Sequence, residues 1–255
     1  MFMNYMKDIL ETLCKAVRFV LVETSHPGNI GASARAIKTM GFNQLHLVCP
    51  KHFPHETAFY RAKAANDILD GTIVHQDLAS AVEECQLIIG TSARNRKVPW
   101  PVINPREAAE EIVNLSLSGS SDIAIVFGRE NHGLTNQELG LCNLHVAIPS
   151  SLEYSSLNLS QAVQILAYEI RINLIAKSNQ TPVPEWDVPL ANAKEIEKLI
   201  DHFDQIMQEV NFYDKDNPRQ LLTRVRRFFK RSRIDHMEAN IFRGLFSTIQ
   251  KKIKK

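Results

Sequence analysis

Three polar segments in the first two thirds of the chain contain the residues best suited to hold a ligand and act on it. The first combines Asn29 with Arg35, and the second contains Glu130. The third is the serine-rich run 155–160, which includes Asn158. A guanidinium matches phosphate and sugar oxygens, a carboxylate accepts hydrogen bonds, and a serine-rich turn before a helix offers backbone N–H groups. These residue types predict a site for a ligand that carries a sugar, a phosphate or a carboxylate.

Each segment also has a purely structural interpretation. Asn29 would cap a helix over 30–40, and Arg35 would lie at the edge of that helix and pair with a carboxylate such as Glu130. The third segment would cap the helix that apolar periodicity predicts over 161–170. Its capping candidates are Ser155, Ser156 and Asn158. The residues alone leave both interpretations open.

A fourth loop has the composition of a ligand site beside a polyanion. Thr91, Ser92 and Ala93 follow a short apolar run, and Arg94 and Arg96 come soon after them. Small hydroxyl residues let a ligand approach closely, and arginines bind phosphate. Because loops of this composition are common, the interpretation depends on where the fold places this loop.

Short apolar runs alternate with helical patterns from Arg18 to Asn173. Strands are predicted over 19–22, 44–48, 72–74, 87–90, 123–127 and 145–148. Helices are predicted over 30–40, 55–69, 77–85, 105–117, 135–142 and 161–170. This order predicts an α/β fold with a mostly parallel sheet, helices on both faces, and ligands outside the carboxyl ends of the strands. All four polar loops follow predicted strands, so we expect them at one edge of the sheet.

The chain divides at a proline-rich segment. Residues 178–193 contain three prolines and no apolar period, which indicates a linker. The linker would separate an α/β domain over 18–177 from a small all-helical domain over 194–255. Residues 1–17 form an N-terminal extension to which the sequence assigns no role.

The C-terminal domain is predicted to contain three helices, over 194–210, from Pro218 to Arg233, and after a cap at Asp235. Residues 213–255 hold 13 Lys and Arg against 4 Asp and Glu, so the net charge of this segment is +9. The whole chain has a net charge of +2, so residues 1–212 carry −7. A solvated helix surface is the plainer interpretation, but an excess of this size favours a polyanionic partner. The cations suited to phosphate are Arg224, Arg226, Arg227, Lys230, Arg231 and Arg233.

Several classes of protein are disfavoured by motifs that the sequence lacks. It contains no GxGxxG opening a βαβ unit, no GxxxxGK[ST], no HExxH, no DxDxDG loop and no GxSxG, which disfavours dinucleotide, nucleotide, metal and hydrolase sites. The four cysteines are isolated, which predicts neither disulfides nor a zinc site. Charges interrupt the first sixteen residues, which a signal or membrane span would not tolerate. We therefore expect a cytoplasmic protein without a metal or a membrane partner.

Taken together, the loops resemble the three motifs of the SpoU branch of the SPOUT RNA methyltransferases. The matching patterns are Asn29-x-Gly31-x-x-x-Arg35, then Phe127-Gly128-x-Glu130-x-x-Gly133-Leu134, then Ile148-Pro149 followed by Ser155-Ser156-Leu157-Asn158-Leu159-Ser160-x-Ala162. Their order and spacing agree, and the resemblance covers about residues 18–173. Within the family, the chain is most similar to enzymes that methylate the ribose of nucleotide 32 in the tRNA anticodon loop. The stretch 22–29 and the helical C-terminal extension carry this narrower resemblance.

The resemblance implies features that the residue patterns do not show. These are a trefoil knot in the C-terminal part of the sheet, a homodimer, S-adenosylmethionine (SAM) as methyl donor, and tRNA rather than DNA as substrate. By position, the catalytic or RNA-facing residues would be Asn29, Arg35, Glu130, Ser156 and Asn158. The cofactor-binding residues would be Thr91, Ser92, Ala93, Gly128, Ile148, Ser155, Ser156 and Leu157. Arg35, Arg94 and the C-terminal cations would contact RNA.

The implied reaction is displacement by a ribose 2′-oxygen at a sulfonium methyl group. The protein must align donor and acceptor, and a group must take the hydroxyl proton. The family's proposed base is Arg35, but a guanidinium stays protonated far above neutral pH, so we expect Arg35 to hold the target nucleotide's phosphate and 2′-oxygen. Ser156 and Asn158 would orient the sugar and the SAM carboxylate. The 2′-hydroxyl is the same on cytidine and uridine, so no base preference is predicted.

Two other functions stay open. One is 2′-O-methylation at another tRNA position or in ribosomal RNA, and the C-terminal helices disfavour the wobble-position enzymes, which lack them. The other is a catalytically silent RNA-binding module on the same scaffold. The presence of Arg35, Glu130 and Asn158 disfavours the silent module.

Overall fold

A parallel seven-stranded sheet lies at the centre of the computed structural model, in the order β3-β2-β1-β6-β4-β7-β5. Each recorded pairing between neighbouring strands is parallel. The strands are β1 (Val17–Val22), β2 (Gln44–Val48), β3 (Ile73–His75), β4 (Leu87–Thr91), β5 (Val102–Ile103), β6 (Ile123–Phe127) and β7 (Leu144–Val146). The structure describes residues 13, 15–92, 101–117, 122–151, 153, 156–177, 188–215 and 219–253. The predicted α/β fold with a mostly parallel sheet is confirmed.

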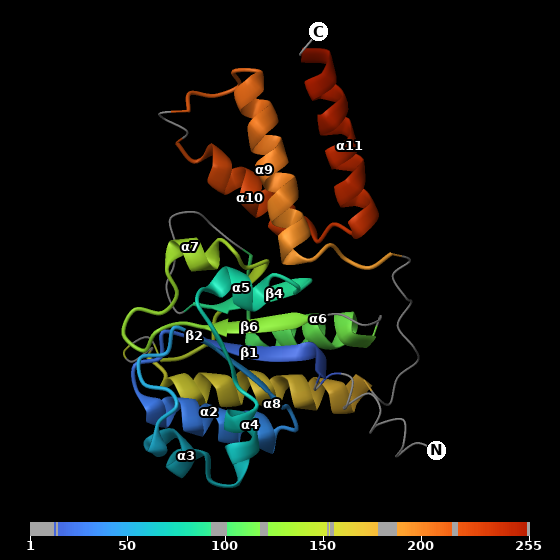
Figure 1. Cartoon of the computed structure of the whole chain (residues 1–255). Coiled ribbons are helices and arrows are strands. Elements are labelled where there is room, and N and C mark those ends of the chain that lie inside the picture. Colours follow the sequence, from blue (N-terminus) through green and yellow to red (C-terminus); the bar gives the residue numbers. More distant parts are fainter. Residues whose placement is uncertain are drawn as a thin grey trace.

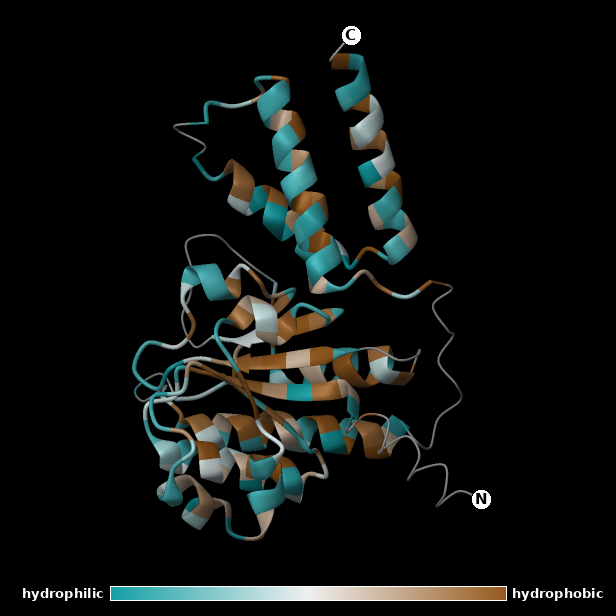
Figure 2. Cartoon of the chain, in the orientation of Figure 1, coloured by the Kyte–Doolittle hydropathy of each residue, from teal (hydrophilic) through white to brown (hydrophobic). Residues whose placement is uncertain are grey.

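Helices cover both faces of the sheet, as predicted (Figure 1). On one face lie α2 (Pro27–Thr39), α6 (Pro105–Leu117) and α8 (Leu159–Lys177), and on the other lie α5 (Leu78–Val82) and α7 (Asn136–Leu139). Strand β1 shows why both faces of the sheet must be covered by helices. Phe19 and Leu21 pack toward the α2 face and Val20 and Val22 toward the α5 face, and all four are at most 1% exposed. A strand buried on both faces must be apolar, as the colouring of β6 and of most of β1 in Figure 2 shows.

One strand was not predicted and one predicted helix is divided, while several other elements differ from the prediction only in their bounds. Strand β5 was not predicted because its two residues are too few for a periodic signal, and Val102 is 61% exposed. The single helix predicted over 55–69 is interrupted at Lys63, whose φ of +56° lies in the left-handed region and ends the first helix. The resulting elements are α3 (Glu56–Ala62), the 3-10 turn η1 (Lys63–Ala65) and α4 (Asn66–Asp70).

The C-terminal segment forms three helices, α9 (Ala193–Glu209), α10 (Leu221–Ser232) and α11 (His236–Ile253). Their shared core contains an aromatic cluster in which neighbouring ring centroids lie 5.0 to 6.2 Å apart. Its members are Phe203, Phe229, Phe242 and Phe246. The predicted cap at Asp235 is confirmed, because its Oδ1 accepts from the backbone N of Glu238 at 2.7 Å. The predicted start at Pro218 lies outside the described residues, and α10 begins at Leu221.

Hydrogen bonds fasten these helices to the α/β domain near the end of α5 and the start of β4. The backbone N of Ala193 donates to the carbonyl of Cys85 at 2.9 Å. The side chain of buried Asn143 bridges the two parts: its Oδ1 accepts from the N of Ile88, and its Nδ2 donates to the carbonyl of Lys230 at 3.0 Å. Arg233 forms an ion pair with Glu111 on α6. These contacts fix where α10 lies relative to the sheet.

The trefoil knot stays a prediction, because the path of the segments 93–100 and 152–155 falls largely outside the described residues. Most of the predicted linker, residues 178–187, also lies outside them. Of the helices that the structure describes, none has the length and apolar content needed to cross a bilayer.

Candidate active site

The carboxylate of Glu130 joins the loops that follow β1 and β6. Its Oε2 accepts from the backbone N and the Oγ of Ser25 at 3.1 and 2.9 Å. Its Oε1 accepts from Nδ2 of Asn29 at 2.9 Å and from the backbone N of His26 at 3.3 Å. Both carboxylate oxygens are therefore held by donors from one loop, as a partly buried charge requires.

The side chains of Asn29 and Asn158 extend this contact into the third polar segment. Nδ2 of Asn158 donates to Oδ1 of Asn29 at 3.1 Å, and Oδ1 of Asn158 accepts from the N and the Oγ of Ser160 at 2.9 and 2.7 Å. Because an ionised Glu130 can only accept, each amide has one possible orientation. One N–H of each asparagine takes part in these bonds, and an amide has two, so each can donate a further bond to a ligand.

Glu130 is kept ionised. Partial burial opposes ionisation, but hydrogen bonds from Asn29 and Ser25 outweigh it and lower the pKa of Glu130 below its ordinary value. At neutral pH the group is a carboxylate with a weakly basic character. It is thus suited to orienting Asn29 rather than to exchanging a proton.

The helix starts differ partly from the predictions. Asn158 is a cap, as predicted, since its side chain accepts from the N of Ser160 in the first turn of α8. Asn29 is not: α2 begins two residues earlier, at Pro27, and the imidazole of His26 caps it by accepting from the N of Gly28 at 3.0 Å. The helical position of Asn29 turns its side chain toward Glu130 instead.

A cavity of about 250 Å³ lies beside this hydrogen-bonded chain. The predicted site residues among those that line it are Thr91, Ser92, Gly128, Glu130, Ile148, Ser156 and Leu157. The rest of the lining is mostly apolar, with Arg129 and His132 as its polar side chains. Its other members are Phe127, Gly133, Leu134, Val146, Leu159 and Ala162. Apolar side chains next to hydroxyl groups and one carboxylate suit a ligand that combines an aromatic ring with polar groups, such as SAM. The predicted residues Ala93, Arg94 and Ser155 lie outside the described residues.

Two motif glycines are explained by close backbone contacts. A Cβ on Gly128 would lie 2.2 Å from the backbone of Gly133, so the tight turn after β6 requires glycine there even though the residue also lines the cavity. A Cβ on Gly31 would lie 2.0 Å from the carbonyl oxygen of Ala58, so this glycine lets α2 and α3 pack backbone to backbone.

Arg35 stands apart from the cavity. Its side chain is exposed on α2, it does not line the cavity, and within the described part of the chain no ion pair or hydrogen bond of its guanidinium is recorded. The structural interpretation allowed a pairing of Arg35 with Glu130, but Ser25, His26 and Asn29 supply the donors to that carboxylate. The structure thus joins Asn29, Glu130 and Asn158 and leaves Arg35 open to an anionic ligand.

The sequence-based prediction missed Ser25, His26 and Arg129. The guanidinium of Arg129 forms ion pairs with Glu23 after β1 and with Glu138 on α7, which raise its pKa and lower that of Glu23. This contact fixes the turn that carries Glu130. Ser25 and His26 lie in a loop that the sequence singles out, but their partner is more than 100 residues away, so no local signal identifies their role.

The six predicted RNA-facing cations of the C-terminal segment divide into two groups. Lys230 is only 1% exposed and forms an ion pair with Glu197 on α9, so it cannot contact phosphate and its prediction was wrong. Burial lowers the pKa of Lys230, and the Glu197 carboxylate opposes that shift. Arg226 also pairs with Glu197, and Arg233 pairs with Glu111. In the other group, Arg224 and Arg231 are exposed and Arg227 is half-buried.

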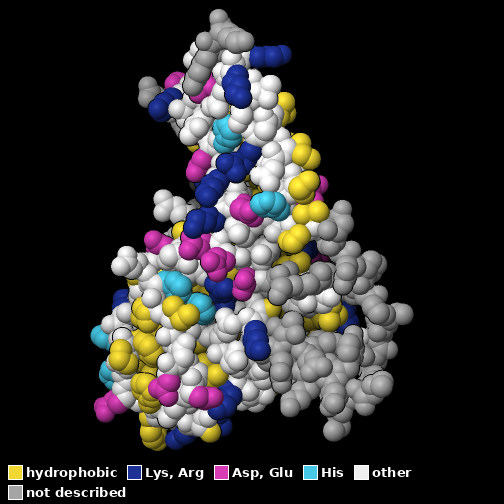
Figure 3. Space-filling model, turned by 45° about the vertical axis from the view of Figure 1, so that its right-hand side comes forward, with side chains coloured by type: hydrophobic (Ala, Val, Ile, Leu, Met, Phe, Trp, Pro, Cys, Tyr) yellow, Lys and Arg dark blue, Asp and Glu magenta, His cyan; other side chains and the backbone are white. Residues whose placement is uncertain are grey.

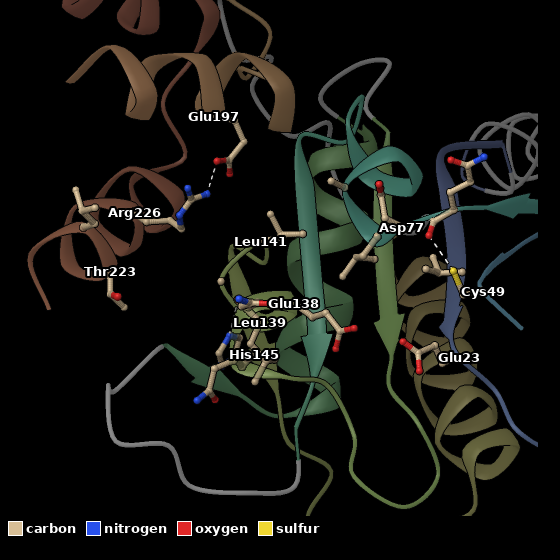
Figure 4. A pocket seen from close by; sticks show the side chains of 18 residues that line it. Glu23, Cys49, Asp77, Glu138, Leu139, Leu141, His145, Glu197, Thr223 and Arg226 are labelled. Atoms are coloured by element: carbon tan, nitrogen blue, oxygen red, sulfur yellow. Dashed lines mark hydrogen bonds and ion pairs between the residues drawn. The ribbon is translucent and has the colours of Figure 1, made fainter. Parts of the chain in front are cut away.

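A larger cavity, of about 1190 Å³, lies between the α/β domain and helices α9 and α10 (Figure 4). Its lining includes four carboxylates, from Glu23, Asp77, Glu138 and Glu197. Figure 4 shows Arg226 pointing across to Glu197. Among the described residues that line this space, the four carboxylates outnumber the cation of Arg226, so it does not suit a phosphate or a carboxylate ligand. Arg226 is the predicted site residue that contributes to this lining.

The parallel sheet, with a hydrogen-bonded polar chain and a cavity at one edge, defines an α/β protein with a ligand site at the carboxyl ends of its strands. Residues 16–168 match the family model described as the SpoU rRNA Methylase family, and the chain belongs to that family. Residues 194–255 match a second family model, described as the C-terminal domain of the tRNA methyltransferase TrmJ.

Similar proteins cover nearly the whole chain. The tRNA (cytidine/uridine/adenosine-2′-O-)-methyltransferase TrmJ of Pseudomonas aeruginosa (strain UCBPP-PA14) is 45% identical over 242 residues, which are 92% of this chain and 94% of the relative. The crystal structure of TrmJ from Z. mobilis ZM4 superposes with a TM-score of 0.77 at 28% identity, covering 91% of this chain and 98% of that one. A probable methylase family protein from Haemophilus influenzae Rd KW20 gives a TM-score of 0.62 at 38% identity, covering 94% and 97%.

Proposed function

We propose that this chain transfers a methyl group from SAM to the ribose 2′-hydroxyl of a tRNA nucleotide, at position 32 of the anticodon loop. The observation that carries the proposal is the hydrogen-bonded chain Glu130–Asn29–Asn158 beside the 250 Å³ cavity. It places two oriented amide donors, one from the first turn of α2 and one from the residue before α8, at the edge of a site with the mixed polar and apolar character that SAM requires. The TrmJ relatives, named as tRNA 2′-O-methyltransferases, support the same substrate class.

The residues around the cavity would have different roles according to their chemistry. Gly128, Ile148 and Leu157 would hold the cofactor, with Ser156 and Ser92 supplying hydroxyl groups. Bound there, SAM supplies an electrophilic methyl group. Asn29 and Asn158 would donate to the sugar, and Glu130 would keep their orientation fixed, which lowers the cost of aligning the 2′-oxygen.

Arg35 would act on the nucleotide rather than on the cofactor. It is exposed and lies on the same helix as Asn29, and a guanidinium stays protonated at neutral pH. We propose that it holds the phosphate of the target nucleotide and polarises the 2′-hydroxyl as its proton is lost to solvent. Position 32 rests on the motif resemblance of residues 22–29 and on the C-terminal domain.

The experiment that tests the function is transfer of labelled methyl from SAM to bulk tRNA from cells that lack this protein, followed by nuclease mapping of the labelled nucleotide. Label on the ribose of nucleotide 32 is expected. Label at another nucleotide would reject the position and keep the reaction. Binding of SAM without transfer to tRNA or ribosomal RNA would reject the reaction and favour a silent module.

A homodimer is part of the proposal, and one surface supports it. Tyr168, Ile172 and Ile175 of α8 are 48%, 42% and 41% exposed at i, i+4 and i+7, so they form an apolar stripe on one helix face. A second copy would cover this stripe. We expect Ile172→Glu to convert the dimer to a monomer, as measured by light scattering. The control is Glu110→Gln, an exposed change on α6, which should leave the dimer intact. A native chain that is monomeric would reject the proposed dimer.

A further inference from the structure

Helix α10 presents two chemically different faces. Arg226 and Lys230 face Glu197 on α9. Arg224, Arg227, Phe228 and Arg231 occupy positions i, i+3, i+4 and i+7, which lie together on another face. Three cations therefore surround one aromatic side chain.

Phe228 is unusual on this face because it is large, apolar and 48% exposed. The guanidinium carbon of Arg231 lies 5.9 Å from the centre of its ring, and the ring of Phe229 packs against it from the core at 5.2 Å and 72°. Neighbouring side chains thus hold the ring while it stays open to solvent. Such a ring is preorganised for stacking.

An apolar groove of about 390 Å³ continues from this ring. Its rim and walls come from Arg224 and Phe228 of α10 and from Phe242 and Leu245 of α11, and its floor is the aromatic core of the C-terminal domain. Leu245 is 54% exposed. The groove is apolar inside and cationic along the edge formed by α10.

We propose that this groove takes an unpaired base of the tRNA substrate, stacked on Phe228, while Arg224, Arg227 and Arg231 contact the adjoining phosphates. Bases of every type have a flat π-face, and single-stranded RNA is commonly bound by exposed aromatic side chains among cations. Helix α10 contains no acidic residue, and Figure 3 shows Lys and Arg side chains gathered over the upper, C-terminal part of the molecule. A second copy would bring the same arginines against one another, which disfavours self-association at this surface.

This inference rests on the proposed function, because it assigns a subsite for the same substrate. Its test is tRNA affinity measured over a series of salt concentrations for Phe228→Ala, Phe228→Leu, Phe228→Trp and Arg224→Gln. The control is Ile241→Ala, since Ile241 is 68% exposed on α11 but does not line the groove. Thermal unfolding is measured for every variant.

Phe228→Ala and Phe228→Leu should weaken binding about 5- to 100-fold with an unchanged salt slope, because they remove a stacking surface but no charge. Phe228→Trp and Ile241→Ala should bind as the native chain does. Arg224→Gln should reduce the salt slope by about 0.7, the value for one phosphate of single-stranded RNA. The leucine variant keeps the apolar volume, so its weaker binding at an unchanged melting temperature would not arise from misfolding.

Native affinity in Phe228→Leu would overturn the base-stacking subsite, and so would a change of oligomeric state in that variant. Methyl transfer by the native chain to the same tRNA is measured in parallel. Transfer by the native chain together with full binding by Phe228→Leu rejects only the subsite. Absence of both transfer and tRNA binding in the native chain rejects the proposed function itself.

Discussion

Polar residues are arranged in opposite ways at the edge of the sheet and on the outer face of α10. At the sheet edge, Glu130, Asn29 and Asn158 hold one another in one geometry, with distances of 2.9 and 3.1 Å. On α10, Arg224, Arg227 and Arg231 surround Phe228, and the exposed side chains of Arg224 and Arg231 have no recorded ion pair with a described residue.

This difference between fixed and outward-facing polar side chains fits the two functions proposed for these regions, catalysis and RNA binding. A group-transfer site needs donors fixed to a fraction of an ångström, which mutual hydrogen bonds provide. A surface that grips a polyanion works through summed charge and tolerates mobile side chains. We therefore expect substitutions at the sheet edge to act on the catalytic rate and substitutions on α10 to act on binding.

The largest effect is expected from Asn29→Ala, which removes the middle of the chain between Glu130 and Asn158. The rate of methyl transfer at saturating tRNA should fall about 10²- to 10³-fold, the range seen when a positioned donor is lost. Single-turnover kinetics would measure the fall, and tRNA affinity should stay within about twofold. The control is Asn131→Ala, at an exposed neighbour of Glu130, which should keep the native rate of methyl transfer. Equal rates of transfer in the two variants would contradict a catalytic role of the hydrogen bonds at the sheet edge.

A smaller loss, about 10- to 100-fold in transfer rate, is expected from Arg35→Lys. Lysine keeps the charge but cannot reproduce the planar fork that holds a phosphate and a hydroxyl together. The measurement is the rate of transfer with SAM affinity determined separately by calorimetry. Full activity in the lysine variant would show that Arg35 contributes charge alone.

Replacement of Arg224, Arg227 and Arg231 by Gln should weaken tRNA binding about tenfold or more and reduce the salt slope by about two. The matched control is Arg226→Gln with Lys230→Gln on the inner face of the same helix. Because those residues pair with Glu197, the control should lower the melting temperature and leave the salt slope unchanged. Equal slopes in the two variants would contradict the division of α10 into two faces.

The smallest effect is a pH dependence at the sheet edge. The pKa of Glu130 is lower in the folded chain than in the unfolded one, so its contribution is complete above the unfolded pKa and is lost as the pH falls through the folded value. Glu130→Gln should reduce the free energy of unfolding by about 1 kcal/mol at pH 7. Denaturant titrations should show this difference shrinking as the pH falls below the ordinary glutamate pKa of about 4.3. A difference that does not change with pH over the acid range would mean that the carboxylate charge is not its source.

Much of the fold followed from local patterns. All six predicted strands are present, and the central ones have a clear cause: residues buried on both faces, such as Phe19 and Val20, must form continuous apolar runs. The cap at Asp235 was also predicted, and Asn158 was one of three predicted candidates for the cap of α8, since capping depends on a side chain and a backbone N–H only two or three residues apart. The motif residues Asn29, Glu130 and Asn158 were identified for the same reason: their residue types and spacing are visible in the chain itself.

Tertiary structure alone decided which partner each polar side chain received. Glu130 lies 105 residues from Ser25 and accepts from it rather than from Arg35, because the parallel order of β1 and β6 brings those two loops together. Lys230 looked like its neighbours in sequence, but the packing of α10 on α9 buries it against Glu197. Charge, periodicity and capping are properties of short segments and can be read from the sequence. The pairing of distant side chains depends on how whole elements pack, and it is fixed only in the folded molecule.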